Sequence, residues 1–172
     1  MKCDLLMRIQ EMEIAADLGQ VREIWLNGAK KAHAPHIREA FWDQRLSAFA
    51  GEARDATERY VYKDEGSQIR AFLLAIAKGD GYGYILELYV DDDFQNQGIG
   101  TALFNTLKGQ NPQLPQLKGR YGTFTSSVYA HNDTSVAWHM KNKFKIGGVM
   151  FCPHTGLPKL EMMWKRPDRP VD

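Results

Sequence analysis

The sequence predicts a protein of the α/β (α+β) class, and its length, composition and hydrophobic periodicity support that prediction. A chain of 172 residues is close to one domain at roughly 150 residues per domain, so we expect a single domain over 1–172. Hydrophobic residues make up 44% and charged residues 25%, which is ordinary for a globular protein and argues against a disordered or coiled-coil chain. Segments with strand-like and helix-like periods alternate in the order βααβββαβαββ, with seven strands and four helices.

The first third of the chain is predicted to form a strand followed by two helices. The strand covers 5–10, and Asp17 then stands where an N-cap is expected, ahead of apolar residues at helical spacing. After Ala34-Pro35, a second amphipathic segment over 37–49 predicts another helix, which Gly51 is expected to end.

A hairpin and a further strand are predicted in the middle of the chain. Its two strands cover 59–62 and 68–77, joined by a turn at 64–66, and the second is apolar on both faces, so it should be central. The segment 84–90, YILELYV, predicts the next strand, in which Glu87 is the only charged residue.

The last part of the chain begins with a helix near Gly98, where apolar residues start to recur every four positions, and Gly109 ends this helix. The remaining predicted elements are a loop over 110–116, a strand over 123–130, a helix capped by Asn132 and running to about 142, and two strands over 145–152 and 159–164.

Charge and cysteine content indicate the compartment and limit the partners. Lys plus Arg total 22 and Asp plus Glu total 21, so the net charge of +1 gives no electrostatic reason to expect nucleic acid or an anionic membrane. Cys3 and Cys152 are too few for a disulfide scaffold and favour a reducing, cytoplasmic compartment. Asp4 interrupts the N-terminal apolar residues, and the apolar run 71–77 is far shorter than the roughly 18 residues of a membrane-spanning helix. We therefore expect a soluble, cytoplasmic protein.

The strongest local signal is QNQGIG at 95–100, which follows a strand and an acidic turn and opens a helix. Glycines let the backbone approach a ligand, and the first N–H groups of a helix are unpaired at the positive end of its dipole. A pyrophosphate is expected to bind such a terminus, whereas a plain glycine-rich turn explains the pattern equally well. The amides that would hold the pyrophosphate are those of Gln97, Gly98, Ile99, Gly100 and Thr101.

Other phosphate-binding and catalytic motifs are absent from the sequence. Leu103 stands where a dinucleotide-binding fingerprint needs a third small residue, and no Gly-Lys dipeptide exists to form a P-loop. The patterns HExxH, CxxC and GxSxG are also missing, so metal-dependent hydrolysis and acyl-serine chemistry have no sequence support.

Two motifs in the same order resemble the GNAT family of N-acetyltransferases. Gln95, Gly98 and Gly100 match the family's acetyl-CoA pattern Gln/Arg-x-x-Gly-x-Gly/Ala, and NDTSVAWHMKNKF at 132–144 resembles its N-x-x-A-x-x-F-Y-x-K-x-G-F segment. The resemblance covers about 8–164 and includes an uncharacterised bacterial branch. It implies a GNAT-like acyl-CoA N-acyltransferase fold, in which about four helices flank a mixed, mostly antiparallel sheet of about seven strands.

The resemblance implies how acetyl-CoA is bound. The strand that carries Leu88, Tyr89 and Val90 would splay from the strand 123–130, with the pantetheine arm in the gap. Backbone amides near Tyr89 and Val90 would bind the thioester carbonyl, and an amine would attack it directly. The cofactor-binding residues are then Leu88, Tyr89, Val90, Gln95, Asn96, Gln97, Gly98, Ile99, Gly100, Thr101 and Asn132; for Asn132 a plain N-cap role is the equal alternative.

Two residues depart from the family pattern. His139 stands where members often have a Tyr that protonates the departing thiolate, so His139 is a candidate acid, with a surface histidine and protonation by water as the alternative. Lys143 stands where the family usually has Gly. We expect an effect of Lys143 on the helix end rather than on the chemistry.

Glu87 is the candidate general base for the attacking amine, because it is an isolated carboxylate on a strand that borders the proposed cleft. A solvent-facing charge or an arginine partner is the structural alternative. His33 and Trp42 lie in the segment that resembles the acceptor-binding region and are the substrate-binding candidates. His33 and His36 have a spacing that also permits a metal, but no recognisable ligand set completes a site, so no metal is predicted.

The sequence thus predicts an acetyl-CoA-dependent N-acetyltransferase that acts on a primary amine. The alternative is a non-catalytic acyl-CoA-binding or sensing module on the same fold. The expected partners are acetyl-CoA and an amine acceptor, without nucleic acid or membrane, and the last two strands leave a homodimer open.

Overall fold

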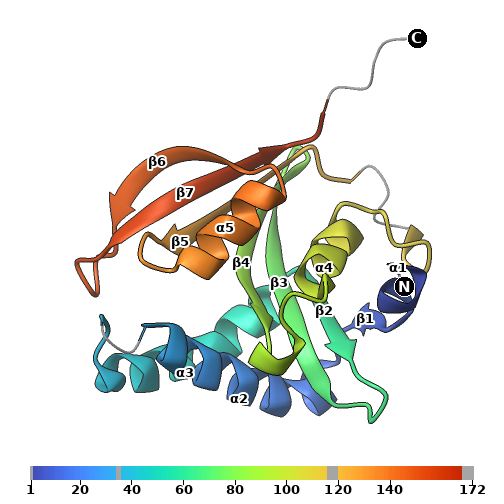
Figure 1. Cartoon of the computed structure of the whole chain (residues 1–172), viewed down its shortest axis with the longest axis horizontal. Helices are drawn as coiled ribbons and strands as arrows, with labels where there is room; N and C mark the ends of the chain where they lie inside the picture. Colours follow the sequence, from blue (N-terminus) through green and yellow to red (C-terminus); the bar gives the residue numbers. More distant parts are fainter. Residues whose placement is uncertain (1, 34–35, 116–119, 168–172) are drawn as a thin grey trace.

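The computed structural model describes residues 2–33, 36–115 and 120–167, and its strands form one seven-stranded sheet. The order in the sheet is β1-β2-β3-β4-β5-β7-β6, and every neighbouring pair is antiparallel except β4 and β5 (Figure 1). The mixed, mostly antiparallel sheet confirms the predicted fold class. The strands are β1 (Ile9–Glu11), β2 (Glu58–Lys63), β3 (Ile69–Gly79), β4 (Tyr82–Val90), β5 (Thr123–Tyr129), β6 (Lys145–Phe151) and β7 (Pro158–Lys165).

Helices cover both faces of the sheet (Figure 1). Two long helices pack on one face and bury Trp25, Phe49 and Phe72 between helix and sheet. The opposite face buries Leu103, Phe104 and other apolar side chains under the remaining helices. The helices are α1 (Lys2–Met7), α2 (Ile14–His33), α3 (Glu39–Asp55), α4 (Ile99–Leu107) and α5 (Asp133–Lys141), with a short 3-10 helix η1 (Asp92–Phe94).

The N-terminal prediction was wrong in part, because the first half of the expected strand over 5–10 is helical. The chain forms α1 over Lys2–Met7 and then the short strand β1. Leu5 and Leu6 pack on the core beside α4, so tertiary contacts favour a helix over the weak alternation of the sequence. Only Ile9, which is 2% exposed, follows the strand prediction into the core.

Two helix boundaries also differ from the prediction. Asp17 is not an N-cap, since α2 already begins at Ile14 and the Asp17 carboxylate accepts a hydrogen bond from the Glu13 backbone N–H at 3.0 Å. Gly51 does not end α3, which continues to Asp55 because Ala53 is fully buried one turn after Phe49. The predicted helix boundary at Ala34-Pro35 and the loop end at Gln116 lie outside the described residues.

The parallel strands β4 and β5 pair only at their beginnings. Tyr82, Gly83 and Tyr84 pair with Thr123, Phe124 and Thr125, and no further pair joins these two strands, whose residues are all described. Opposite β3, the register of β4 shifts between Glu87 and Ile85, which makes Leu86 an extra, bulged residue. The carboxyl ends of β4 and β5 therefore diverge, as the family resemblance implied.

Lys143 adopts a backbone conformation that favours glycine. Its φ of 69° follows the end of α5, at the position where many helices place a left-handed glycine. We expect Lys143→Gly to raise the free energy of unfolding in urea by about 0.5–1 kcal/mol, because the strained Cβ is removed. Lys141→Gly, within the same helix, is the control and should lower it by roughly 1 kcal/mol. A lower stability of Lys143→Gly would contradict this account.

The strand β6 forms an edge of the sheet and is exposed on both faces. Its side chains Ile146, Val149 and Phe151 are 51%, 63% and 69% exposed. β6 is one of the last two strands, for which the sequence left a homodimer open, and the homodimer stays a prediction. None of the helices within the described ranges has both the length and the apolar character needed to cross a membrane.

Candidate active site

The loop from β4 to α4 is held in place by the side chains of the QNQGIG segment. Gln95 Nε2 donates to the backbone oxygen of Val90 at 3.1 Å and to Asp92 Oδ1 at 2.8 Å, which ties the loop to the end of β4. Gln97 Nε2 donates to the Asp93 oxygen at 3.2 Å. Asn96 and Gly98 take φ values of 61° and 85°, so the chain turns sharply into the helix.

The N-terminus of α4 lies beside the end of β4 and has no side-chain cap. Gly98 is its N-cap and offers no side-chain oxygen to the first N–H groups of the helix, which are those of Ile99, Gly100 and Thr101. A Cβ at Gly100 would lie 3.1 Å from Trp138 Nε1 and 3.5 Å from Val90 Cγ2. Glycine at this position therefore lets α4, α5 and the end of β4 meet.

Asn132 is the N-cap of α5, as predicted. Its side-chain oxygen accepts a hydrogen bond from the Ser135 backbone N–H at 3.1 Å. The bond uses the amide oxygen, and the role of Asn132 toward a cofactor stays a prediction.

His139 is buried, which corrects the alternative of a surface histidine. The residue is 5% exposed; its Nδ1 lies 2.7 Å from the Ser135 backbone oxygen and its Nε2 lies 2.8 Å from Ser126 Oγ. Since a carbonyl oxygen only accepts, Nδ1 carries the proton and neutral His139 accepts the Ser126 hydroxyl at Nε2. Burial lowers the pKa of His139, so its imidazolium form is disfavoured at neutral pH.

Glu87 lies on the other face of the sheet, beneath α2 and α3. Its side chain is 26% exposed, and its Oε1 lies 3.4 Å from Arg45 Nη2. Burial raises the pKa of Glu87 to about 7; Arg45 opposes this rise and Glu52 adds to it. Glu87 therefore changes charge close to neutral pH, although the arginine partner that was its structural alternative is also present.

His33 and Trp42, the predicted substrate-binding residues, are in contact at the end of α2. Their rings stack with centroids 5.5 Å apart, and His33 Nδ1 lies 2.7 Å from His131 Nε2. His36 also packs on His131, at 4.1 Å between ring centroids. Burial lowers the pKa of His33 to about 4, and the neighbouring histidines and Lys159 add to the effect.

Lys159 of β7 connects these two groups of side chains. Its Nζ lies 4.9 Å from the ring centroid of Tyr129, which packs edge-on against His33 at 5.0 Å. The positive charge of Lys159 also acts on Glu87, whose pKa it lowers. Lys159 therefore lies within electrostatic reach of both Glu87 and the cluster of rings around His33.

Five residues of this face were not predicted from the sequence, namely Arg45, Glu52, Tyr129, His131 and Lys159. The sequence shows Arg45 and Glu52 as ordinary charges of an amphipathic helix, seven residues apart and thus on one face. No local pattern marks Lys159 or His131. Lys159 reaches the site through its pairing with Tyr129 of β5, and His131 follows that strand and contacts His33.

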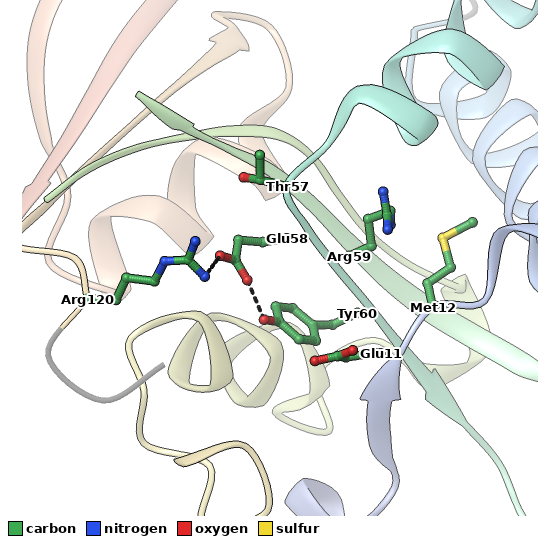
Figure 2. A pocket seen from close by; sticks show the side chains of 7 residues that line it. All are labelled: Glu11, Met12, Thr57, Glu58, Arg59, Tyr60 and Arg120. Carbon is green, nitrogen blue, oxygen red and sulfur yellow. Dashed lines mark hydrogen bonds and ion pairs between the residues drawn. The ribbon is translucent and has the colours of Figure 1, made fainter. Parts of the chain in front are cut away.

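A separate cavity of about 140 Å³ lies beside the first residues of β2, and Glu11, Met12 and Arg120 also line it (Figure 2). Its buried carboxylate, Glu58, accepts hydrogen bonds from Tyr60 Oη at 2.5 Å and Tyr121 Oη at 2.7 Å, and pairs with Arg120 Nη1 at 2.6 Å. Three donors satisfy this carboxylate, so we assign it to stabilising the fold. Within the described residues no group of three or more His, Cys, Asp or Glu side chains is arranged to hold a metal ion.

Comparison with known proteins places the site in context. The family model described as the acetyltransferase (GNAT) family matches residues 13–144. No curated protein matches the sequence. The fold is shared with solved structures of low sequence identity.

Three of these structures illustrate the similarity. PaiA N-acetyltransferase from Thermoplasma acidophilum, in complex with coenzyme A, is 16% identical with a TM-score of 0.72, over 92% of this chain and 98% of that chain. Ribosomal-protein-alanine N-acetyltransferase from Brucella melitensis is 18% identical with a TM-score of 0.63, over 92% and 99%. YncA from Salmonella typhimurium, with its cofactor acetyl-CoA, is 16% identical with a TM-score of 0.62, over 95% and 96%. Because the family model spans most of the sequence and these structures share the fold, the chain belongs to the acetyltransferase (GNAT) family.

Proposed function

We propose that the protein is an N-acetyltransferase that transfers the acetyl group of acetyl-CoA to a primary amine by direct attack. The observation that carries the proposal is the divergence of β4 and β5 beside the uncapped N-terminus of α4, with Glu87 on the opposite face. Two of the similar structures are described with coenzyme A or acetyl-CoA, which supports this donor.

The donor fits the residues around α4. The free N–H groups of Ile99, Gly100 and Thr101 suit a pyrophosphate, since they are unpaired donors at the positive end of a helix dipole. Gln95, Asn96, Gln97 and Gly98 shape the loop, and Leu88, Tyr89 and Val90 line the divergent strand end toward which the pantetheine arm would extend. Asn132, the N-cap of α5, would contribute its remaining side-chain amide group to the cofactor. Acetyl-CoA supplies the activated acetyl group.

Glu87 removes the proton from the attacking amine. The nitrogen forms a bond to the acetyl carbon, the carbon–sulfur bond breaks, and the ammonium proton passes to Glu87 directly or through water. A pKa near 7 suits this role, because the carboxylate is then available as a base at neutral pH and can accept the proton.

The thiolate of coenzyme A takes its proton from water in this proposal. His139 is the other candidate, but its Nε2 accepts a hydrogen bond from Ser126 in the neutral form, and burial disfavours the imidazolium form that could donate. We assign His139 to holding Ser126 and α5 in place.

The acceptor would lie between Glu87 and the ring cluster. Tyr129 and Lys159, from the neighbouring strands, are half-buried on this side of the site. His33 packs against Tyr129 and Trp42, and only 8% of His33 and 4% of Trp42 are exposed, so these two rings would support the acceptor side from behind rather than form its surface. This aromatic surrounding suits an amine that carries a flat or apolar group.

Thermal unfolding with acetyl-CoA tests the donor site. A ligand at ~100 times its Kd should stabilise the folded protein by roughly 2.7 kcal/mol, which gives a clear rise in Tm. Thr101→Asp should keep the Tm of the unliganded protein, because a carboxylate is favourable in the first turn of a helix, yet it should abolish the rise by repelling the pyrophosphate.

Asn105→Asp is the matched control, since it adds the same charge farther along α4 and should leave the rise intact. Unchanged Tm values of the folded wild type at millimolar acetyl-CoA would overturn the proposal. If acetyl-CoA binds, release of coenzyme A with a panel of primary amines separates the enzyme from a non-catalytic acyl-CoA-binding module, for which no amine gives turnover.

A further inference from the structure

Arg45 of α3 is shared unequally between two carboxylates. Its Nη1 and Nη2 lie 2.6 and 3.0 Å from Oε1 and Oε2 of Glu52, respectively. These contacts form a bidentate ion pair between residues two helical turns apart. Its contact with Glu87 is a single one of 3.4 Å, near the limit of a hydrogen bond. The guanidinium carbon also lies 5.7 Å from the Trp25 ring centroid, so Arg45 is held from three sides.

This sharing matters because all three charged side chains are partly removed from water. The side chains of Arg45, Glu52 and Glu87 are 25%, 33% and 26% exposed, so the interactions among them are screened less than those on an open surface. One positive charge faces two negative ones, and the nearer carboxylate, Glu52, takes the better geometry. Glu87 is therefore left with only part of the stabilisation that an arginine can give to a carboxylate.

The other groups that face Glu87 come from the surrounding elements. Helix α2 contributes the Trp25 side chain, a hydrogen-bond partner that lowers the pKa of Glu87, and β7 contributes the positive charge of Lys159. Tyr84 lies on the same strand and has a raised pKa, partly because of Glu87, so it is neutral at physiological pH. Glu52 is thus the negative charge that acts on Glu87, and Arg45 and Lys159 are the positive ones.

We infer that Arg45 and Glu52 are positioning residues that set the protonation of Glu87. Arg45 orients the Glu87 carboxylate, and Glu52 binds most of the Arg45 guanidinium, so that Glu87 is paired only weakly and stays basic. The inference rests on the proposed function, since it concerns the residue proposed as the base. Neither Arg45 nor Glu52 is placed to touch the reacting atoms. Together they fix the pH at which the site becomes active.

The two residues are expected to act in opposite directions. Glu52→Gln removes a negative charge and frees Arg45 to pair with Glu87, so the pKa of Glu87 should fall by roughly one pH unit. Arg45→Gln leaves two carboxylates without their shared cation, so the pKa of Glu87 should rise by roughly one unit or more. If Arg45 and Glu52 had a purely structural role, the two variants would not shift the pKa of Glu87 in opposite directions.

The experiment is a pH titration of the glutamate side-chain carboxyl carbons of the full chain by NMR, which needs no knowledge of the acceptor. Comparison with Glu87→Gln identifies the Glu87 signal. Arg45→Lys keeps the charge and should restore a midpoint near that of the wild type. Asp55→Asn, an exposed charge at the end of the same helix, is the matched control and should leave the midpoint unchanged.

The outcomes separate this inference from the proposed function. The inference is overturned if Glu87 titrates at the same pH in the wild type, in Glu52→Gln and in Arg45→Lys, and if Arg45→Gln has that midpoint too or does not fold. This holds even if Glu87→Gln has lost its activity. Full activity of Glu87→Gln would show that Glu87 is not the base, which overturns the proposed mechanism and, with it, a catalytic role for Arg45 and Glu52. With an amine that the wild type acetylates, the acidic limb of kcat/KM against pH should follow the NMR midpoints in each variant.

Discussion

Glu87→Gln is expected to lower kcat/KM for acetyl transfer by roughly 10²- to 10⁴-fold, the usual contribution of a general base. The amide is nearly the same size as the carboxylate and cannot accept the proton of the attacking amine. It lies on the acceptor face of the sheet, whereas the proposed donor site lies at α4, so the Kd for acetyl-CoA should change little. The measurement is steady-state release of coenzyme A with an amine that the wild type acetylates.

The pH dependence of this reaction follows from the pKa of Glu87. The base must be ionised, so kcat/KM should rise as the pH increases through about 7 and level off above it. The acidic limb should vanish in the residual activity of Glu87→Gln. Glu161→Gln, an exposed carboxylate of β7, is the control and should stay within roughly twofold of the wild type. A Glu87→Gln enzyme with wild-type kcat/KM would dismiss Glu87 as the base.

Acidification is expected to destabilise the protein by about 3 kcal/mol through His33 alone. The pKa of His33 is about 4 in the folded protein against a usual value of 6.5, because the side chain is only 8% exposed beside two other histidines. Between pH 6.5 and about 4, His33 binds a proton in the unfolded chain but stays neutral in the folded protein. The contribution of His33 to stability is thus complete above pH 6.5 and is lost as the pH falls toward 4.

Urea unfolding of the wild type and of His33→Phe between pH 4 and pH 7.5 measures this effect. Phenylalanine keeps a ring against Trp42 but does not titrate, so the loss of stability on acidification should be smaller in the variant by about 3 kcal/mol. Glu87 has a raised pKa, so its protonation stabilises the folded protein on acidification. Both proteins contain Glu87, so this opposite contribution cancels when they are compared. Parallel stability curves for the two proteins would show that His33 titrates normally in the folded state.

Local patterns in the sequence were reliable where they were strong and misleading where they were weak. The hairpin, the rich strand β4 and the helix after Gly98 occur where the periodicity put them. The N-terminal strand was predicted from a loose alternation, and the packing of Leu5 and Leu6 beside α4 made that segment helical instead. Gly51 was expected to end a helix, but the burial of Ala53 beyond it stabilises the last turn of α3.

Part of the candidate site could be predicted from local sequence, and part depends on contacts between distant segments. Gln95, Gly98 and Gly100 belong to one short segment, so the sequence alone predicted the loop and the open helix terminus, which depend on local backbone conformation. The isolation of Glu87 in an apolar strand was also visible, but its pKa was not, because Arg45 and Glu52 reach it from a helix some 40 residues earlier in the chain.

The sequence by itself therefore determined the order of the elements after the N-terminal helix α1, the glycine turn and the residue types available for chemistry. Only the tertiary structure decided which of those residues meet: His139 with Ser126, His33 with His131, and Glu87 with Arg45. The physical reason is that periodicity and turn preferences act over a few neighbouring residues, whereas burial and charge pairing act across the sheet, between segments whose separation in sequence carries no trace of their contact.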